Sequence, residues 1–182
     1  MKDSKFSKNL RYALLFLFAI FFTALAGQSF PEGYFHLADP LVMMGAVVLP
    51  LPYAMIVSAL ACATVDWIKG YTLLTITTVV AKILLVLAVK GLMKLPAAQK
   101  FPDLIAAPAA LLSIPLYYLG AAVDYFYNHL PNGSITAALS YATRVLKKET
   151  VQAFLGILVF ILLYGIYKKM KDRKAKKQPD QE

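Results

Sequence analysis

Long apolar runs separated by short polar turns dominate this chain. Because backbone polar groups in lipid must be hydrogen-bonded within their own segment, such runs predict helices. Most approach the roughly 20 residues that cross the hydrocarbon core, and the second is too short to do so unaided. The pattern therefore predicts an all-α integral membrane protein, a bundle of six transmembrane helices with an outward-facing binding cavity. The six runs are residues 12–27, 37–49, 53–68, 71–93, 104–127 and 151–167.

Prolines and polar residues mark the expected breaks between these helices. The hinge at residues 50–52, Pro-Leu-Pro, separates the second run from the third. Pro108 or Pro115 is expected to bend the fifth helix, since a proline removes one helix hydrogen bond and clashes with the preceding turn. Residues 90–103 read as a basic loop, and residues 135–146 as a short amphipathic helix before the last span.

The composition agrees with a membrane protein. Hydrophobic residues make up 59% of the 182 residues and charged residues 16%, against about 45–50% and 25% in soluble domains. We expect one membrane domain over residues 12–167. A basic N-terminus (residues 1–11) and a basic tail (residues 168–182), solvated and mobile, would flank it.

The net charge of +9 is a topology signal, because its basic residues flank the apolar runs. With both termini inside, four basic residues of the N-terminus, three of the 90–100 segment and seven of the tail are cytoplasmic. Only Lys69, Arg144, Lys147 and Lys148 then lie outside. The positive-inside rule therefore predicts cytoplasmic termini. No zinc spacing or aromatic-basic interleaving indicates nucleic-acid binding.

Two features of the first apolar segments have alternative interpretations. The basic start and the Ala-Leu-Ala at residues 24–26 resemble a signal peptide with its cleavage site. We favour a retained helix, because the rest of the chain is itself membrane-embedded. Cys62 is the single cysteine, so it forms no internal disulfide, and we expect it to serve packing and not a metal site.

Polar and aromatic residues gather at the outer ends of the helices. Aromatic faces with a few donors and acceptors are what a small ring-shaped ligand requires. Asp66 also continues a stripe of small residues at positions 54, 58 and 62, so close packing would aim it into the bundle. An aromatic belt with ordinary loop charges is the alternative reading. The predicted binding residues are His36, Asp39, Asp66, Trp67, Tyr71, Tyr125, Asn128 and Lys148.

Lys82 lies near the middle of the fourth run. An unpaired lysine there costs about 2.5–3.5 kcal/mol on insertion scales. We therefore expect it to face the bundle interior, toward a polar partner or a water-filled cavity. The sequence leaves open whether it contacts ligand or braces helices.

Ala19, Thr23 and Gly27 recur every four positions in the first run. Small residues at that spacing let another helix approach closely. They indicate either packing inside the bundle or docking of a partner subunit.

Catalysis is not indicated. The chain has two histidines, His36 and His129, and neither lies in a His-Glu-x-x-His motif or near a Gly-x-Ser-x-Gly motif. Asp66 has no second acid three or four residues further on, so the helix lacks a paired-carboxylate metal site. We expect a binding protein with no metal and no cofactor of its own.

Three segments resemble a known family. They are Gly-Tyr-Phe-His-Leu-Ala-Asp-Pro at residues 33–40, Ala59-x-x-x-Ala63-x-x-Asp66-x-x-x-Gly70-Tyr71, and Thr-Val-Val-Ala-Lys at residues 78–82. Together with six spans and a length near 180 residues, they are similar to the substrate-binding S components of energy-coupling factor (ECF) vitamin transporters. The hydroxymethylpyrimidine and pyridoxine types are the most similar.

This resemblance implies high-affinity binding of a B vitamin or precursor in the bacterial cytoplasmic membrane. Hydroxymethylpyrimidine or pyridoxine is favoured, then riboflavin or pantothenate. A membrane coupling subunit and two ATPases would drive uptake, so ATP would be used by those partners. The absence of a Gly-x-x-x-x-Gly-Lys-[Ser/Thr] motif here agrees. The alternatives are a free-standing secondary transporter and, behind it, a membrane enzyme.

The resemblance also favours partner docking for the stripe of Ala19, Thr23 and Gly27. The loop at residues 28–37 joins the first helix to the second at the outer face, and its Pro31 and Gly33 suit a hinge. We expect it to act as a lid over bound ligand, with Gln28, Glu32 and Gly33 as its residues.

Overall fold

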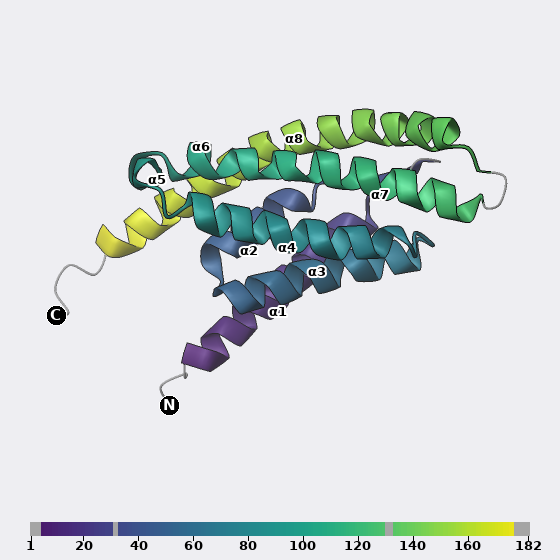
Figure 1. Cartoon of the computed structure of the whole chain (residues 1–182). Helices are drawn as coiled ribbons and strands as arrows, with labels where there is room; N and C mark the ends of the chain where they lie inside the picture. Colours follow the sequence, from purple (N-terminus) through teal and green to yellow (C-terminus); the bar gives the residue numbers. More distant parts are fainter. Residues whose placement is uncertain (1–4, 31–32, 130–132, 177–182) are drawn as a thin grey trace.

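The computed structural model describes residues 5–30, 33–129 and 133–176. Within these ranges the chain is helical apart from one short β-hairpin and the turns (Figure 1). The elements are α1 (Lys5–Leu25), β1 (Gln28–Phe30), β2 (Gly33–Phe35), α2 (Asp39–Val48), α3 (Leu51–Ile68), α4 (Leu74–Leu92), α5 (Pro96–Lys100), α6 (Pro102–Ala106), the 3₁₀ helix η1 (Ala107–Leu112), α7 (Ser113–Asn128) and α8 (Ile135–Lys176).

Five segments of the described ranges are long and apolar enough to cross a membrane. They are α1, α3, α4, the stretch Pro102–Asn128 and α8. This supports an all-α, multi-pass membrane protein. The sixth expected span, α2, has only 10 residues, about 15 Å of helix, which is half of a hydrocarbon core.

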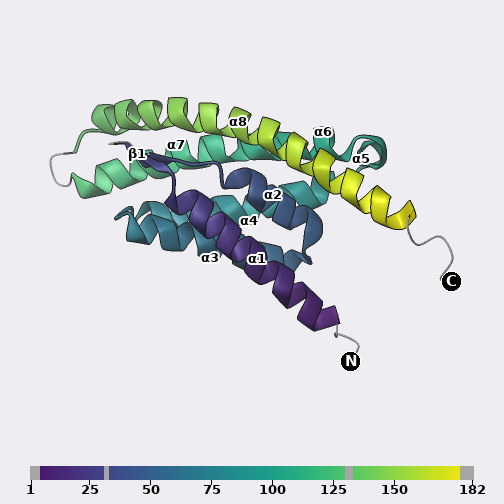
Figure 2. The ribbon, with the colours of Figure 1, turned by 180° about the vertical axis from the view of Figure 1, so that it is seen from behind.

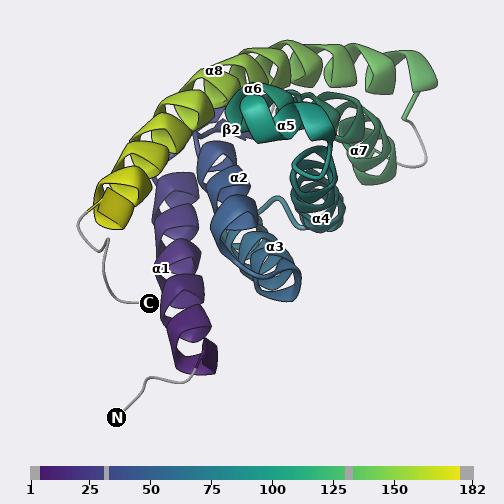
Figure 3. The same cartoon turned by 90° about the vertical axis from the view of Figure 1, so that its left-hand side faces the viewer.

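The short helix α2 lies in the middle of the bundle. Seven of its residues are buried, including Val42, Met43 and Ala46, and it packs against α4 and α8 as well as α1 and α3. A helix that is apolar all round is a buried helix. Figure 3 shows α2 and α3 flanked by α1 on one side and by α4 on the other.

Close backbone approach fixes the contact between α4 and α7. A Cβ added at Gly120 would collide with the side chain of Thr77, so only glycine fits there. At the other end of α4, the Lys90 Nζ donates to the Leu49 carbonyl at 2.8 Å. This bond secures the end of α2 beside the hinge at residues 50–52.

The α-helix is interrupted around one of the two prolines that were expected to bend it. Residues 107–112, which include Pro108, are 3₁₀ helix between α6 and α7. The segment at residues 90–103 is less of a loop than predicted, because α4 continues to Leu92 and α5 follows.

The largest departure from the sequence prediction is α8. Residues 135–146 and 151–167 are not two helices, because one continuous helix of 42 residues covers both and runs on to Lys176. The polar residues between them, Lys147 to Thr150, have sufficient helix propensity to continue the pattern of backbone hydrogen bonds. The first part of the tail is therefore helical up to Lys176, not a mobile extension.

The two described ends of the chain lie at the same end of the bundle (Figure 1). The β-hairpin lies at the opposite end, between α1 and α8 (Figure 2). The hairpin strands are antiparallel, with Gln28 opposite Phe35 and Ser29 opposite Tyr34. Tyr34 and His36 are two residues apart, so they project to the same side of the strand.

Candidate functional site

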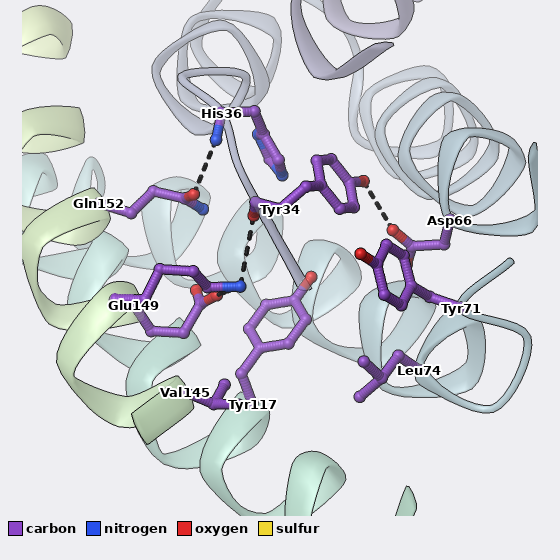
Figure 4. Close-up of a pocket in the computed structure, with 10 residues that line it drawn as sticks. Tyr34, His36, Asp66, Tyr71, Leu74, Tyr117, Val145, Glu149 and Gln152 are labelled. Carbon is purple, nitrogen blue, oxygen red and sulfur yellow. Dashed lines mark hydrogen bonds and ion pairs between the residues drawn. The ribbon is translucent and has the colours of Figure 1, made fainter. Parts of the chain in front are cut away.

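A small cavity of about 30 Å³ lies at the hairpin end of the bundle (Figure 4). A volume of this size holds about one water molecule. Four of the eight predicted binding residues line it, namely His36, Asp66, Tyr71 and Lys148. Six further residues line it that the sequence did not single out, namely Tyr34, Leu74, Tyr117, Val145, Glu149 and Gln152.

Tyr34 fills much of the space on the hairpin side. Its hydroxyl donates to Asp66 Oδ1 at 2.6 Å. Its ring stacks on Tyr71 at 5.7 Å and lies 4.9 Å from the His36 ring, centroid to centroid. Burial, together with the neighbouring Asp66 carboxylate, raises the pKa of Tyr34 well above its usual range. Tyr34 is thus a neutral donor held in an aromatic stack.

His36 is held through its backbone N–H and through its ring. Its N–H donates to Gln152 Oε1 at 2.9 Å, and the Ala38 N–H donates to His36 Nδ1 at 3.2 Å. Burial, with the positive charge of Lys82 as the second cause, lowers the pKa of His36 to about 3. The ring is therefore neutral at physiological pH, with its proton on Nε2.

Two buried carboxyl groups face each other across the cavity. Figure 4 shows Asp66 on the α3 side and Glu149 on the α8 side. Each is only 4% exposed. Asp66 Oδ2 and Glu149 Oε2 have no hydrogen-bond partner among the described residues. The other Glu149 oxygen is 3.3 Å from Lys148 Nζ, which also donates to the Tyr34 carbonyl at 3.3 Å.

Tyr117 of α7 closes the cavity opposite Tyr34 (Figure 4). Its hydroxyl shares a 2.9 Å hydrogen bond with Thr78 of α4. Lys82 Nζ also lies over the Tyr117 ring, 5.5 Å from the ring centroid. Three tyrosines thus surround the cavity, Tyr34, Tyr71 and Tyr117.

Below the cavity, Lys82 forms an ion pair with Asp39. The two side chains are 1% and 2% exposed. Lys82 therefore faces the bundle interior and has a polar partner, as the sequence predicted. Asp39 does not line the cavity, because its carboxylate is engaged by Lys82 at the N-terminus of α2.

Besides Asp39, three predicted binding residues lie outside this cavity. Trp67 is 71% exposed on the outer side of α3. Tyr125 and Asn128 instead line a second, wider hollow of about 480 Å³ at the end of α7. There Asn128 donates to Asp124 at 3.2 Å, and the Tyr125 ring stacks on His129 at 4.1 Å.

The predicted lid is the β-hairpin. Gln28 and Gly33 lie on its two strands, while Glu32 is outside the described residues. Side chains of the bundle hold the hairpin down. Lys69 Nζ donates to the Gly27 carbonyl at 2.8 Å, and the Tyr71 hydroxyl donates to the Phe30 carbonyl at 3.3 Å.

The small-residue stripe of α1 does not form one uniform face. Ala19 is exposed and Thr23 is half-buried. A Cβ at Gly27 would lie 2.6 Å from the Phe35 carbonyl and 2.8 Å from His36 Cβ. Gly27 therefore serves the approach of the hairpin, and the open part of the stripe is Ala19 and Thr23.

The missed cavity residues do carry a sequence signal. Val145, Lys148, Glu149 and Gln152 follow the i, i+3, i+4, i+7 spacing of one helix face. That spacing runs across the boundary that the sequence analysis placed between two helices, so it was hidden. For Tyr34, the alternation with His36 along a strand is the corresponding signal.

Fold and site together define a helical multi-pass protein with an enclosed polar and aromatic cavity near one end. No protein-family model, curated protein or solved structure matches this chain.

Proposed function

We propose that this chain is the substrate-binding S component of an ECF-type transporter and that it takes up a B vitamin or vitamin precursor. The observation that supports this most is the cavity. It lies at the end of the bundle opposite the termini, and it combines three tyrosine rings with buried polar groups. Small-ligand sites are concave, largely apolar and provided with a few placed polar groups.

A ligand with a single ring suits this cavity best. The free volume of about 30 Å³ must grow even for one ring. Displacing Tyr34 alone would release a space the size of a phenol. Hydroxymethylpyrimidine and pyridoxine fit such a space, whereas riboflavin has three fused rings and pantothenate has none. The site is proposed to bind and not to catalyse.

A thermal-shift panel on the purified chain tests the proposed function. It compares hydroxymethylpyrimidine, pyridoxine, riboflavin and pantothenate at concentrations far above micromolar. A ligand present at about 100 times its Kd stabilises the folded state by about 2.7 kcal/mol. We expect a clear rise in Tm with one single-ring compound. If no member of the panel raises Tm, the proposal is wrong.

We propose that the hairpin opens to admit the ligand and closes over it. Two of the bonds that attach it to the bundle, those of Lys69 and Tyr71, are exposed or half-buried. Opening would also break the buried bond from Tyr34 to Asp66, which the ligand would replace. Bound ligand should then slow hydrogen exchange over residues 28–37. Unchanged exchange at saturating ligand would exclude a lid.

Uptake itself would depend on partners. We propose a membrane coupling subunit that docks on the open part of the α1 stripe and two ATPase subunits behind it. Ala19 is exposed, so Ala19→Trp should block close approach without entering the cavity. Ile56→Trp, at a side chain 64% exposed on α3, is the matched control. Lost co-purification with the coupling subunit for Ala19→Trp alone, at normal ligand affinity, is the expected result.

A free-standing secondary transporter is the second candidate. The buried pair of Asp39 and Lys82 favours it, because charged residues inside a membrane bundle are common in ion-coupled carriers. Liposomes that contain only this chain separate the two functions. Uptake driven by a proton or sodium gradient would identify a carrier, whereas an S component alone should give none.

A further inference from the structure

The unpaired oxygens of Asp66 and Glu149 carry information about the ligand. Buried carboxyl oxygens are normally hydrogen-bonded, and each exception in a folded protein calls for an explanation. These two occur in the same cavity, on different helices. Within the described part of the chain, both oxygens are therefore available to accept hydrogen bonds from a molecule that enters the cavity.

The surroundings of these oxygens favour donors and positive charge. Asp39 is already neutralised by Lys82, and His36 is neutral. Among the cavity-lining side chains this leaves two carboxyl groups against one ammonium, that of Lys148. Lys148 is engaged with Glu149 Oε1 and the Tyr34 carbonyl. A carboxylate ligand would add a third carboxyl group to a space that already holds two.

Tyr34 shows what kind of group the site accepts. Its phenol is a flat ring that stacks on Tyr71 and donates a hydrogen bond to Asp66 Oδ1. A ligand ring in the same stack would meet Asp66 at one edge. Glu149 lies on the opposite side of the cavity (Figure 4).

We propose that the ligand is a flat nitrogen heterocycle with hydrogen-bond donors on two edges, an amine or a protonated ring nitrogen among them, held between the carboxyl groups of Asp66 and Glu149. This inference rests on the proposed function and specifies its substrate class. Ring compounds with a carboxylate at the corresponding position bind more weakly. Hydrogen bonds to charged groups contribute about 1.5–3 kcal/mol each, so each should be worth about 10- to 100-fold in Kd.

Two matched sets of probes test this on the full chain in lipid nanodiscs. The first set is pyridoxamine, pyridoxine and 4-pyridoxate, which differ only in an aminomethyl, a hydroxymethyl or a carboxylate group on one ring. The second set is 4-amino-5-hydroxymethyl-2-methylpyrimidine and its 5-carboxylate. Calorimetry gives Kd for each. In the set that binds, we expect the carboxylate to be at least about 10-fold weaker than its amine or hydroxymethyl counterpart.

Variants connect this preference to the two carboxyl groups. Glu149→Gln and Asp66→Asn keep the shape of the side chain and replace the carboxyl group by an amide. Each should raise the Kd of the preferred probe about 10-fold or more. Each should also reduce the ratio between the Kd of the carboxylate compound and that of the preferred probe. Asp124→Asn, in the wider hollow at the end of α7, is the matched control and should change neither. If one variant fails to fold, the other variant and the wild-type ratio still decide.

The outcomes separate the two proposals. Binding of a ring compound with equal or better affinity for the carboxylate member overturns the inference and leaves the proposed function standing. Wild-type selectivity that neither Glu149→Gln nor Asp66→Asn reduces also overturns it. Binding of no compound in either set or in the vitamin panel overturns both.

Discussion

Two layers of ionisable side chains lie one below the other along α4, and they differ in whether their polar atoms have partners within the described chain. In the lower layer, Asp39 and Lys82 neutralise each other and are almost fully buried. In the cavity layer, Asp66 and Glu149 are nearly as buried, yet each keeps an oxygen without a partner in the described chain. The lower layer is complete without a ligand. The cavity layer is not, which suggests that the first braces the bundle and the second binds.

The two layers are close enough to influence each other. Leu74, Thr78 and Lys82 lie on one face of α4, at steps of four residues, so one side of this helix serves both layers. The hydroxyl of Tyr117 bonds to Thr78, and its ring lies beside Lys82. Variants in the two layers should nevertheless differ in their effects. Those in the lower layer should change the stability of the protein, and those in the cavity layer should change its affinity for the ligand.

The largest effect is expected from breaking the lower pair. Lys82→Met leaves the Asp39 carboxylate buried without a partner, and removing one member of such a pair typically costs about 3–5 kcal/mol. Thermal or denaturant unfolding in detergent measures the loss. The double variant Asp39→Leu with Lys82→Met removes both charges and should recover much of it. A single variant as stable as the wild type would contradict the bracing role.

His36 lies near groups of both layers. Its titration should give the second largest effect, a dependence of protein stability on pH. Its pKa is lowered to about 3 in the folded chain, against about 6.5 when unfolded. The stability that depends on the neutral ring is therefore complete above about pH 6.5 and is lost as the pH falls toward 3. Between about pH 6.5 and pH 5 the loss should reach about 2 kcal/mol. His36→Gln should reduce the slope of stability against pH; an equal slope would show that another group titrates.

Tyr34→Phe should affect both properties by a smaller amount. It removes the hydroxyl that donates to Asp66 at 2.6 Å, which should cost about 1.5 kcal/mol of stability. Because the ligand no longer competes with that hydroxyl, affinity should rise severalfold. Calorimetry with the best probe of the vitamin panel measures it. Weaker binding would mean that the Tyr34 hydroxyl contacts the ligand and does not compete with it.

The smallest stability effect belongs to the cavity layer. Glu149→Gln should change the free energy of unfolding by less than about 1 kcal/mol, because the oxygen that it replaces makes no hydrogen bond within the described chain. The same variant should bind the preferred probe markedly less well. A destabilisation as large as that of Lys82→Met would remove the distinction between the layers.

The sequence predicted the parts of this arrangement that depend on a local pattern. The stripe of Ala54, Ser58 and Cys62 is buried and does aim Asp66 inward. Lys82 is buried and paired, since an isolated ammonium in a bundle core is too costly. Both conclusions follow from helical periodicity and the cost of burying charge, which need no tertiary information.

The parts of the cavity that the sequence did not predict depend on where helices end and which ends meet. Trp67 follows Asp66 directly, but one residue is about 100° of helix rotation, so it faces away. Tyr125 and Asn128 are on α7, whose end diverges into the wider hollow. Glu149 was missed because the sequence was divided at the polar residues 147–150, where α8 in fact continues.

The unbroken length of α8 also sets the depth of the cavity in a bilayer. Its apolar stretch at residues 151–167 is about 26 Å long, close to the thickness of a hydrocarbon core. When α8 crosses a membrane, the helical turns before Val151 must therefore stand in the headgroup region or in water. Glu149 and Gln152 lie at this boundary and are buried, so the route from water to the cavity would not cross the hydrocarbon. Opening of the hairpin at the membrane surface would therefore be enough to bring the carboxyl groups into contact with a hydrated solute.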